Sequence, residues 1–264
     1  IASTVARPEG PVAVVIRLAQ STARVEPPLT VYRLADASVE SAIASDPPVL
    51  LLRTSEGTRH SFTTAQVPLT SLAVISSSAT TSADGGASGD AGATLPMREV
   101  PAVALQRSEA WQVEGAAAVA ASEGYGAATT DRHFVVTMAE ATNEPQCSGV
   151  WCLAEGSVSL VTWPARGGPV ARSLSQHGRG ESVAQGANSA VVALVAEENG
   201  ARQVAHTLAS GGDGGGAVTT ETVNLRGVRR AKVVFCGTEP WVVYGAMTPE
   251  ARLGALPLAC VSRR

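Results

Sequence analysis

The chain has 264 residues, of which 45% are hydrophobic and 16% charged, and its formal net charge is −3. This length and hydrophobic content allow a sizeable core and exclude a chain that is disordered throughout. Basic residues are scattered apart from one cluster near Arg226, so the charge pattern predicts neither a nucleic-acid partner nor binding to an anionic membrane.

Aromatic content and hydropathy argue against further classes of function. Aromatic residues make up only 4% of the chain, too few to supply both a core and the exposed rings on which single-stranded nucleic acid or carbohydrate stacks. No stretch approaches the roughly 18 to 20 apolar residues of a membrane-spanning helix, so we expect no transmembrane segment. The first residue is Ile1 and no signal peptide is recognisable, which predicts a processed or trimmed terminus.

Paired short runs open the chain. Residues 11–18 are mainly apolar and precede an alternating run at 29–34, and 49–53 stands in the same relation to 60–63. A buried run followed across a polar turn by an alternating run is typical of a β-hairpin. Residues 1–75 are therefore predicted to be a β-rich N-terminal part.

The composition changes after this part. Residues 76–94 consist of Ser, Thr, Ala, Gly and Asp, which cannot form a packed core, so 76–97 is predicted to be a flexible insert or linker. The remaining part, 98–264, is predicted to hold β-rich repeats. It begins with an Ala-rich stretch whose composition favours helix, but Gly115 breaks the pattern and we expect a strand over 115–122.

The strongest pattern in the C-terminal half is a repeated Val-Val pair. The pairs begin at Val135, Val191 and Val242, 56 and then 51 residues apart, and each lies in a short apolar run. A period of this size indicates a repeated supersecondary unit.

Strands can be assigned around the second and third pairs. Short runs bounded by Gly, Asn and Pro predict four strands around the second pair and three around the third. These are 181–186, 188–196, 202–210 and 217–225, then 231–237, 241–247 and 253–261. Because the last unit lacks a fourth strand, we expect Ile1–Val5 to complete it and so remove an exposed sheet edge.

Antiparallel units of about 50 residues with four strands are the blades of β-propellers. In period and strand number the chain resembles β-propeller proteins, closely over 115–264 and less closely over 1–75, without the motif of a particular propeller family. The resemblance implies an all-β fold of antiparallel repeats in a ring of about five blades. A tandem β-sandwich is the alternative.

Four cysteines indicate the compartment. Cys147 and Cys152 enclose four residues, while Cys236 and Cys260 both lie in the last repeat. An even set with this spacing predicts two disulfides in an exported protein that is secreted, periplasmic or at the cell surface. Free thiols and a zinc site are the alternatives, although no histidine neighbours Cys236 or Cys260.

No catalytic pattern stands out. Asp131 and His133 could orient one another as a base and its partner, but no serine-nucleophile motif accompanies them, and an Asp before a buried strand commonly caps a turn. Of the other histidines, His60 and His206 fall on predicted strands and His177 in a predicted turn. We therefore expect no catalytic residue, no metal and no cofactor.

The function expected from these observations is that of a non-enzymatic scaffold or binding protein. Its loops would contact a macromolecular partner, either another protein or a second copy of the chain. One candidate contact is the basic cluster, predicted to be a solvated loop between blades: Arg226, Arg229, Arg230 and Lys232. The alternatives are a secreted hydrolase with a site near Asp131/His133 and a structural subunit of a cell-surface or extracellular assembly.

Overall fold

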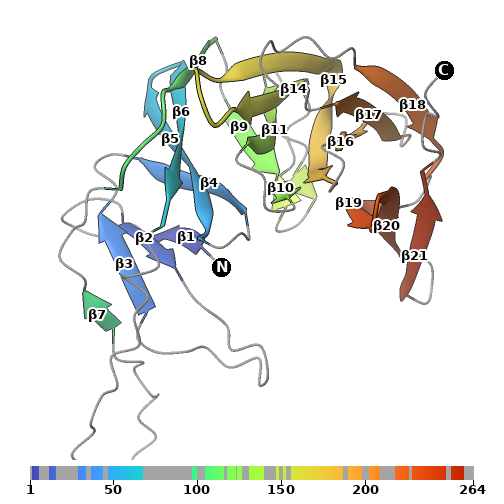
Figure 1. Ribbon diagram of the computed structural model, residues 1–264, viewed down its shortest axis with the longest axis horizontal. Coiled ribbons are helices and arrows are strands. Elements are labelled where there is room, and N and C mark those ends of the chain that lie inside the picture. The colour runs from blue at the N-terminus through green and yellow to red at the C-terminus, as the bar shows by residue number, and fades with distance from the viewer. Residues whose placement is uncertain are drawn as a thin grey trace, which may run out of the picture.

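The computed structural model shows a β-protein (Figure 1). Every regular element of the described residues is a β-strand, and all strand pairings but two are antiparallel. The structure describes residues 2–5, 12–15, 29–33, 37–43, 47–67, 97–99, 105–115, 118–122, 124–126, 131–139, 147–148, 151–152, 156–186, 190–197, 202–208, 218–225, 228–247 and 251–258. The predicted class, all-β with antiparallel sheets, is confirmed.

The first sheet lies at the N-terminal end of the molecule. Its strands, in spatial order, are β1 (Ala2–Val5), β2 (Val12–Val15), β3 (Leu29–Arg33) and β7 (Met97–Glu99). The expectation that Ile1–Val5 completes the last repeat is wrong, because Ala2 pairs with Val15 and Val5 with Val12. A hairpin between neighbouring segments closes a much shorter loop than a pairing between the two ends of the chain.

The second sheet has four antiparallel strands. They are β4 (Ser38–Ile43), β5 (Val49–Glu56), β6 (Arg59–Gln66) and β8 (Trp111–Glu114). The turn between β5 and β6 contains Gly57 with a φ of 60°, which glycine adopts without steric cost. Trp111 of β8 lies beside Phe62 of β6 with ring centroids 5.5 Å apart, so the strand gains an aromatic contact that helix propensity does not anticipate.

The third and fourth sheets share one long strand, β15 (Val170–Gln185). The third sheet contains β9 (Ala118–Ser122), β11 (Arg132–Ala139), β14 (Gly156–Trp163) and the first half of β15. The fourth contains the second half of β15, β16 (Ala190–Ala196), β17 (Arg202–Leu208) and β18 (Thr219–Val223), and β10 (Gly124–Gly126) pairs with β15 in parallel. The strand predicted for 115–122 corresponds to β9.

The turn predicted around His177 is wrong, because this residue lies inside β15. The neighbouring glycines allow close packing and do not reverse the chain. A Cβ at Gly178 would lie 2.8 Å from the carbonyl oxygen of Ala196, and one at Gly180 would collide with the side chain of Val135. Glycine in a strand interior commonly marks such a close approach.

The last sheet has three strands in the described residues. They are β19 (Val228–Cys236), β20 (Glu239–Met247) and β21 (Ala251–Pro257). A separate small hairpin of β12 (Cys147–Ser148) and β13 (Trp151–Cys152) lies in the connection from β11 to β14.

The sheets follow one another in chain order along an arc (Figure 1). Strand β4 contacts both β1 and β9, and β15 contacts β19. One core packs the second sheet against the third, with Phe62 and Phe134 among its members. Further cores join the third sheet to the fourth and the fourth to the last, so the inner sheets are covered on both faces.

The Val-Val pairs account for this stacking. Neighbouring residues of a strand point to opposite faces. Val136 packs into the core toward the second sheet, and Val135 packs into the core toward the fourth. Val191 and Val192 divide in the same way between the third and the last sheet. The predicted core role of these four residues is confirmed, because none is more than 1% exposed.

The described residues form neither a closed barrel nor a closed propeller ring. In Figure 1 the first and last sheets lie at opposite ends of the arc. The domain boundaries predicted at residues 75 and 97 stay predictions. Strands β7 and β8 lie at or after the end of the predicted linker, but they pair with β3 and β6, which precede it. The segment 76–94 lies outside the described residues.

Candidate functional site

β-Bulges or register shifts interrupt the strand pairing in the second, third, fourth and last sheets. A single extra residue interrupts the pairing of β4 with β5, of β15 with β16 and of β19 with β20, and these residues are Glu40, Glu181 and Arg229. In the first two strands the bulged glutamate precedes a buried serine, Ser41 or Ser182. Bulges change the direction of side chains and are enriched next to functional sites. The bulged positions are therefore candidates for a functional site.

The bulged carboxylate of the second sheet is held within its own sheet. Arg53 Nε on β5 donates to Glu40 Oε1 at 2.8 Å, and Ser38 Oγ donates to the same oxygen at 2.7 Å. The arginine and glutamate side chains are 24% and 13% exposed. These bonds tie the start of β4 to β5, which is a structural use of the carboxylate.

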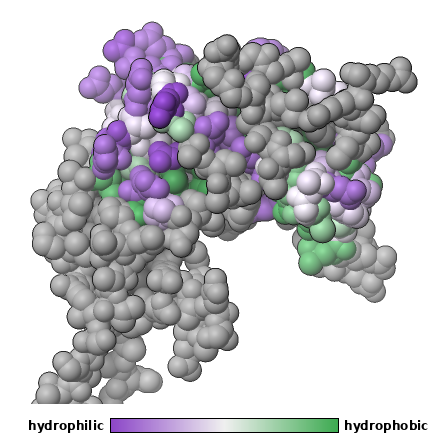
Figure 2. Space-filling view, viewed as in Figure 1, coloured by the Kyte–Doolittle hydropathy of each residue, from purple (hydrophilic) through white to green (hydrophobic). Residues whose placement is uncertain are grey.

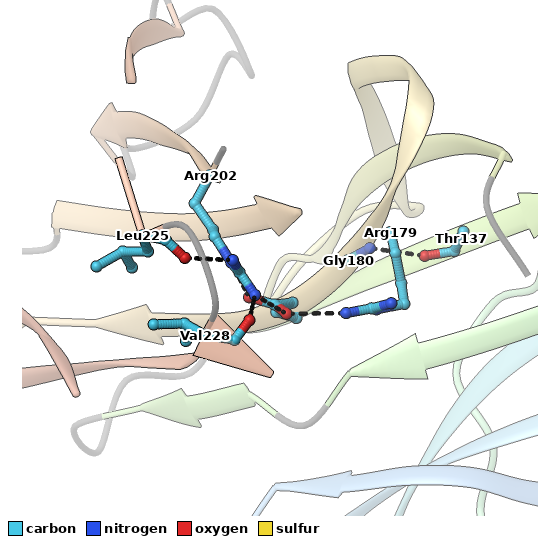
Figure 3. A network of polar contacts seen from close by, with 7 residues as sticks. Thr137, Arg179, Gly180, Arg202, Leu225 and Val228 are labelled. Atoms are coloured by element: carbon cyan, nitrogen blue, oxygen red, sulfur yellow. Dashed lines mark hydrogen bonds and ion pairs between the residues drawn. The ribbon is translucent and has the colours of Figure 1, made fainter. Parts of the chain in front are cut away.

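The bulged carboxylate of the fourth sheet is the centre of a buried charge network (Figure 3). Arg202 Nε of β17 lies 3.2 Å from Glu181 Oε2, and Arg179 Nη2 lies 3.0 Å from Glu181 Oε1. The Arg202 and Glu181 side chains are only 4% and 5% exposed. The single carboxylate of Glu181 thus neutralises part of the charge of two arginines. Burial of the Glu181–Arg202 ion pair costs hydration energy, which its attraction offsets only when hydrogen bonds satisfy the remaining donors and acceptors.

Arg202 also binds the segment that leads to the last sheet. Its Nη1 donates to the Leu225 carbonyl oxygen at 3.0 Å, and its Nη2 donates to the Val228 carbonyl oxygen at 2.6 Å, as Figure 3 shows. Each of the three guanidinium nitrogens of Arg202 therefore has at least one acceptor. The network fixes where β19 begins relative to β17, and its chemistry is that of a structural junction.

Hydroxyl groups link neighbouring sheets in a second repeated pattern. The Gly180 N–H donates to Thr137 Oγ1 at 2.8 Å, between the third and fourth sheets. The Val233 N–H donates to Ser182 Oγ at 3.2 Å, between the fourth sheet and the last. Ser41, at the corresponding bulge of β4, has a buried Oγ without a hydrogen-bond partner among the described residues.

His133 is buried at the N-terminal end of β11. Its Nδ1 lies 2.9 Å from Thr162 Oγ1 of β14, and no hydrogen bond of ordinary geometry reaches its buried Nε2 within the described residues. Burial lowers the pKa of His133 to about 4. The nearby Asp131 and Gln185 oppose this effect, and Arg172 adds to it slightly. His133 is therefore neutral near pH 7 and screened from solvent.

The pairing of Asp131 with His133 that a hydrolase would use is not observed as a hydrogen bond. Asp131 Oδ1 accepts the Ala165 N–H at 3.0 Å at the exposed turn after β14, which is the capping role that the sequence suggests. The only hydroxyl that contacts the imidazole in the described residues is that of Thr162. Asp131 therefore does not orient the imidazole through a hydrogen bond, as the acidic member of a catalytic triad does.

Two other polar contacts involve residues that catalysis could use. His60 Nδ1 lies 2.9 Å from Ser55 Oγ across the β5–β6 hairpin. Arg132 Nη1 donates to Thr64 Oγ1 at 2.9 Å and joins the second and third sheets, and burial lowers the pKa of its guanidinium. His177 is exposed. The side chain of His206 is outside the described part of the molecule.

The cysteines are only partly described. Cys147 and Cys152 are directly opposed in the β12–β13 pair, a position with a Cα separation of about 4.5 to 5.5 Å that a disulfide can span. Cys236 is exposed and forms no disulfide, which does not support its predicted bond to Cys260. Cys260 lies outside the described residues, so this pairing stays a prediction.

The basic cluster does not form the predicted loop. Arg229, Arg230 and Lys232 belong to strand β19, and Arg226 lies outside the described residues. Strand β19 begins before the arginines, at Val228, and the long cationic side chains of Arg230 and Lys232 remain exposed on one face. Arg230 and Lys232 are exposed on the outer face of the last sheet.

No group of three or more potential metal ligands occurs in the described residues. The same residues contain no helix that is long and apolar enough to cross a membrane. No protein-family profile matches the chain, and no curated protein matches it significantly.

Sequence reasoning missed the Glu181–Arg202 network and the bulges. The two residues are separated by a strand and its connections, and Arg202 has no acidic neighbour in the sequence that suggests an ion pair. The repeated Glu-Ser dipeptide at 40–41 and 181–182 was the available signal.

Proposed function

We propose that this chain is an exported, non-enzymatic scaffold or binding protein with a propeller-like stack of about five sheets that contacts a macromolecular partner. The observation that carries the proposal is the outer face of the last sheet. There, Val234 is 36% exposed and Leu253 is 88% exposed, while the opposite face packs into a core. Exposed Arg230 and Lys232 lie on the same outer face, and exposed apolar side chains bordered by polar groups are characteristic of an interaction surface.

The structural roles of the other candidate residues also favour a binding function over a catalytic one. The buried carboxylates hold arginines, Asp131 caps a turn, and His133 is neutral and enclosed. The hydrolase alternative needs an activity that depends on His133. A panel of ester, peptide and glycoside substrates tests it, since an activity that disappears in His133→Gln with the fold intact would overturn the non-enzymatic proposal.

Assembly or partner binding is measured on the full chain. Mass photometry and native mass spectrometry, alone and with fractionated extracellular protein, should reveal a stable complex. A chain that is monomeric and without a partner under all these conditions contradicts the proposal.

Export is tested through the cysteines. Mass spectrometry after alkylation without reductant should leave Cys147 and Cys152 unmodified if they form the proposed disulfide. Modification of both without reductant would remove the main argument for an oxidising compartment.

A further inference from the structure

The bulges of β4, β15 and β19 make corresponding positions of the second, fourth and last sheets directly comparable. The residue after the bulge and the residue two places further on lie on the same face of the strand. In β4 and β15 this face is covered by the next sheet of the arc. The residues at the two positions are small or apolar there, and all are buried: Ser41 and Ile43 in β4, Ser182 and Ala184 in β15.

The last sheet has cations at the same two positions. Arg230 follows the bulge of β19, Lys232 lies two residues further on, and both are exposed. Their neighbours Ala231 and Val233 point to the opposite face and belong to the core toward the fourth sheet. A further sheet of the kind found along the arc would bury both charges against apolar and hydroxyl groups, which offer no counter-charge. We therefore expect a cover of different chemistry.

Apolar side chains occupy much of the rest of this outer face. Figure 2 shows apolar side chains gathered in the region where Figure 1 places β19 to β21. A Cβ at Gly245, the partner of Arg230 on β20, would meet no atom within 4 Å, so the face is open there. The cations therefore lie along one side of the face and exposed apolar residues along the other. Cross-strand pairing places these residues on the same face: Val234, Trp241, Val243, Leu253, Ala255 and Pro257.

A segment that binds on this face must satisfy its own backbone hydrogen bonds. The face of a sheet presents side chains, because the backbone N–H and C=O groups point within the sheet toward neighbouring strands. An extended peptide would lose backbone hydrogen bonds to water without replacement, whereas an α-helix makes them internally. The width of a helix, about 10 Å, also matches the two strand spacings from β19 to β21, about 10 Å together.

We propose that the outer face of the last sheet binds an acidic amphipathic helix of a partner protein, with its carboxylates over Arg230 and Lys232 and its apolar residues over β20 and β21. This inference rests on the proposed binding function and specifies the chemistry of the partner. The two cations are about 7 Å apart along the strand. Two carboxylates four residues apart on a helix are about 6 Å apart, so one side of a helix can meet both cations.

An anionic membrane is the other surface that cations beside apolar groups can bind, but the observations favour the protein helix. Exposed Glu239 lies on the same outer face, opposite Cys236 in the β19–β20 pair, and would be repelled by anionic lipid. The chain as a whole has a net charge of −3. Stable membrane binding commonly needs a larger basic cluster or a lipid anchor in addition.

Binding of synthetic helical peptides to the full chain tests the proposal. The probe is a dye-labelled amphipathic peptide of about 18 residues with a leucine stripe and, beside it, glutamates four residues apart. Two matched peptides carry glutamine or lysine in place of the glutamates. Fluorescence anisotropy should show that the glutamate peptide binds the chain at least about tenfold more tightly than either of the others, and that added salt reduces this difference.

Charge reversal tests whether the peptide binds to this face. The double variant Arg230→Glu/Lys232→Glu should lose at least about tenfold in affinity for the glutamate peptide and gain affinity for the lysine peptide. The gain also shows that the variant is folded. Arg107→Glu/Arg166→Glu is the matched control, since these two arginines are exposed elsewhere on the molecule, and it should discriminate between the peptides as the wild type does.

The outcomes separate this inference from the proposed function. The acidic helix is overturned if the glutamate peptide does not bind up to about 1 mM, if the three peptides bind equally, or if the two double variants behave alike. Binding to phosphatidylserine vesicles without binding of the glutamate peptide also overturns it and assigns the face to a lipid surface. A partner complex that Arg230→Glu/Lys232→Glu leaves unchanged overturns the acidic helix while the binding function stands. Absence of both peptide binding and a partner complex contradicts both proposals.

Discussion

Replacement of His133 by glutamine should remove a defined part of the loss of stability in acid. The imidazole is 7% exposed, and its pKa in the folded chain is about 4, against about 6.5 in an unfolded chain. Because the folded-state pKa is the lower one, protonation favours the unfolded chain. The contribution to stability is present above pH 6.5, declines as the pH falls, and reaches its full loss below pH 4.

The magnitude follows from the two pKa values. Their difference corresponds to about 3 kcal/mol of folding free energy, of which about 2 kcal/mol is lost by pH 5. His133→Gln cannot titrate, so its unfolding free energy should change less between pH 7 and pH 4 than that of the wild type. The variant is expected to be less stable at pH 7, since it disturbs the contact with Thr162, but the two pH profiles should converge in acid.

Urea denaturation at pH 7, 6, 5 and 4, followed by circular dichroism, measures these profiles. His177→Gln makes the same substitution at an exposed position and controls for the chemical change. The reasoning is refuted if His133→Gln retains the wild-type dependence on pH, or if His177→Gln flattens the profile by the same amount.

Two further substitutions test the packing and the charge network. Glu181→Gln should destabilise the fold by about 3 kcal/mol in chemical denaturation, because it leaves buried Arg202 without its carboxylate. The control is Glu114→Gln, which breaks an exposed ion pair with Arg59 and should have no measurable effect on stability. Equal effects of the two substitutions would contradict the structural role assigned to Glu181. Gly156→Ala should lower stability by about 2 kcal/mol or more, because the added Cβ would collide with the Met138 carbonyl oxygen. Gly245→Ala is the control at an open position of β20, and a thermal midpoint as low as that of Gly156→Ala would show that steric contact is not the cause.

The buried strands could be predicted because their signal is local. A strand covered on both faces must be apolar at successive positions, and the runs at Val135–Val136 and Val191–Val192 meet this requirement. The hairpins between adjacent apolar runs could be predicted for the same reason, because few residues separate the two paired strands. This covers most strands of the third, fourth and last sheets.

The elements that the sequence did not predict depend on contacts between residues that are far apart in the chain. Strand β8 forms because Trp111 reaches Phe62, and the sequence near Trp111 carries a helical composition instead. The glycines at 178 and 180 resemble a turn until the neighbouring strands that require them are placed. Likewise, the start of β19 at Val228 could be assigned only once its pairing with Ala246 of β20 was known.

Of the candidate site, the sequence predicted only the structural role of Asp131. The sequence indicated that Asp131 caps a turn, and the Ala165 N–H bond agrees with that interpretation. The sequence did not show that the outer face of the last sheet is exposed, because Val243 belongs to the same motif as the fully buried pairs. Its exposure depends on the absence of a neighbouring sheet, which is a property of the whole arrangement.

Amide hydrogen exchange of β21 tests most directly whether the last sheet is the binding surface. In a complex with the macromolecular partner or a second copy of the chain, the amides of Leu253–Leu256 should exchange more slowly than in the isolated chain. The amides of β18, which belongs to another sheet, should exchange at the same rate in both states. Exchange in β21 that is equally fast in both states would contradict the account.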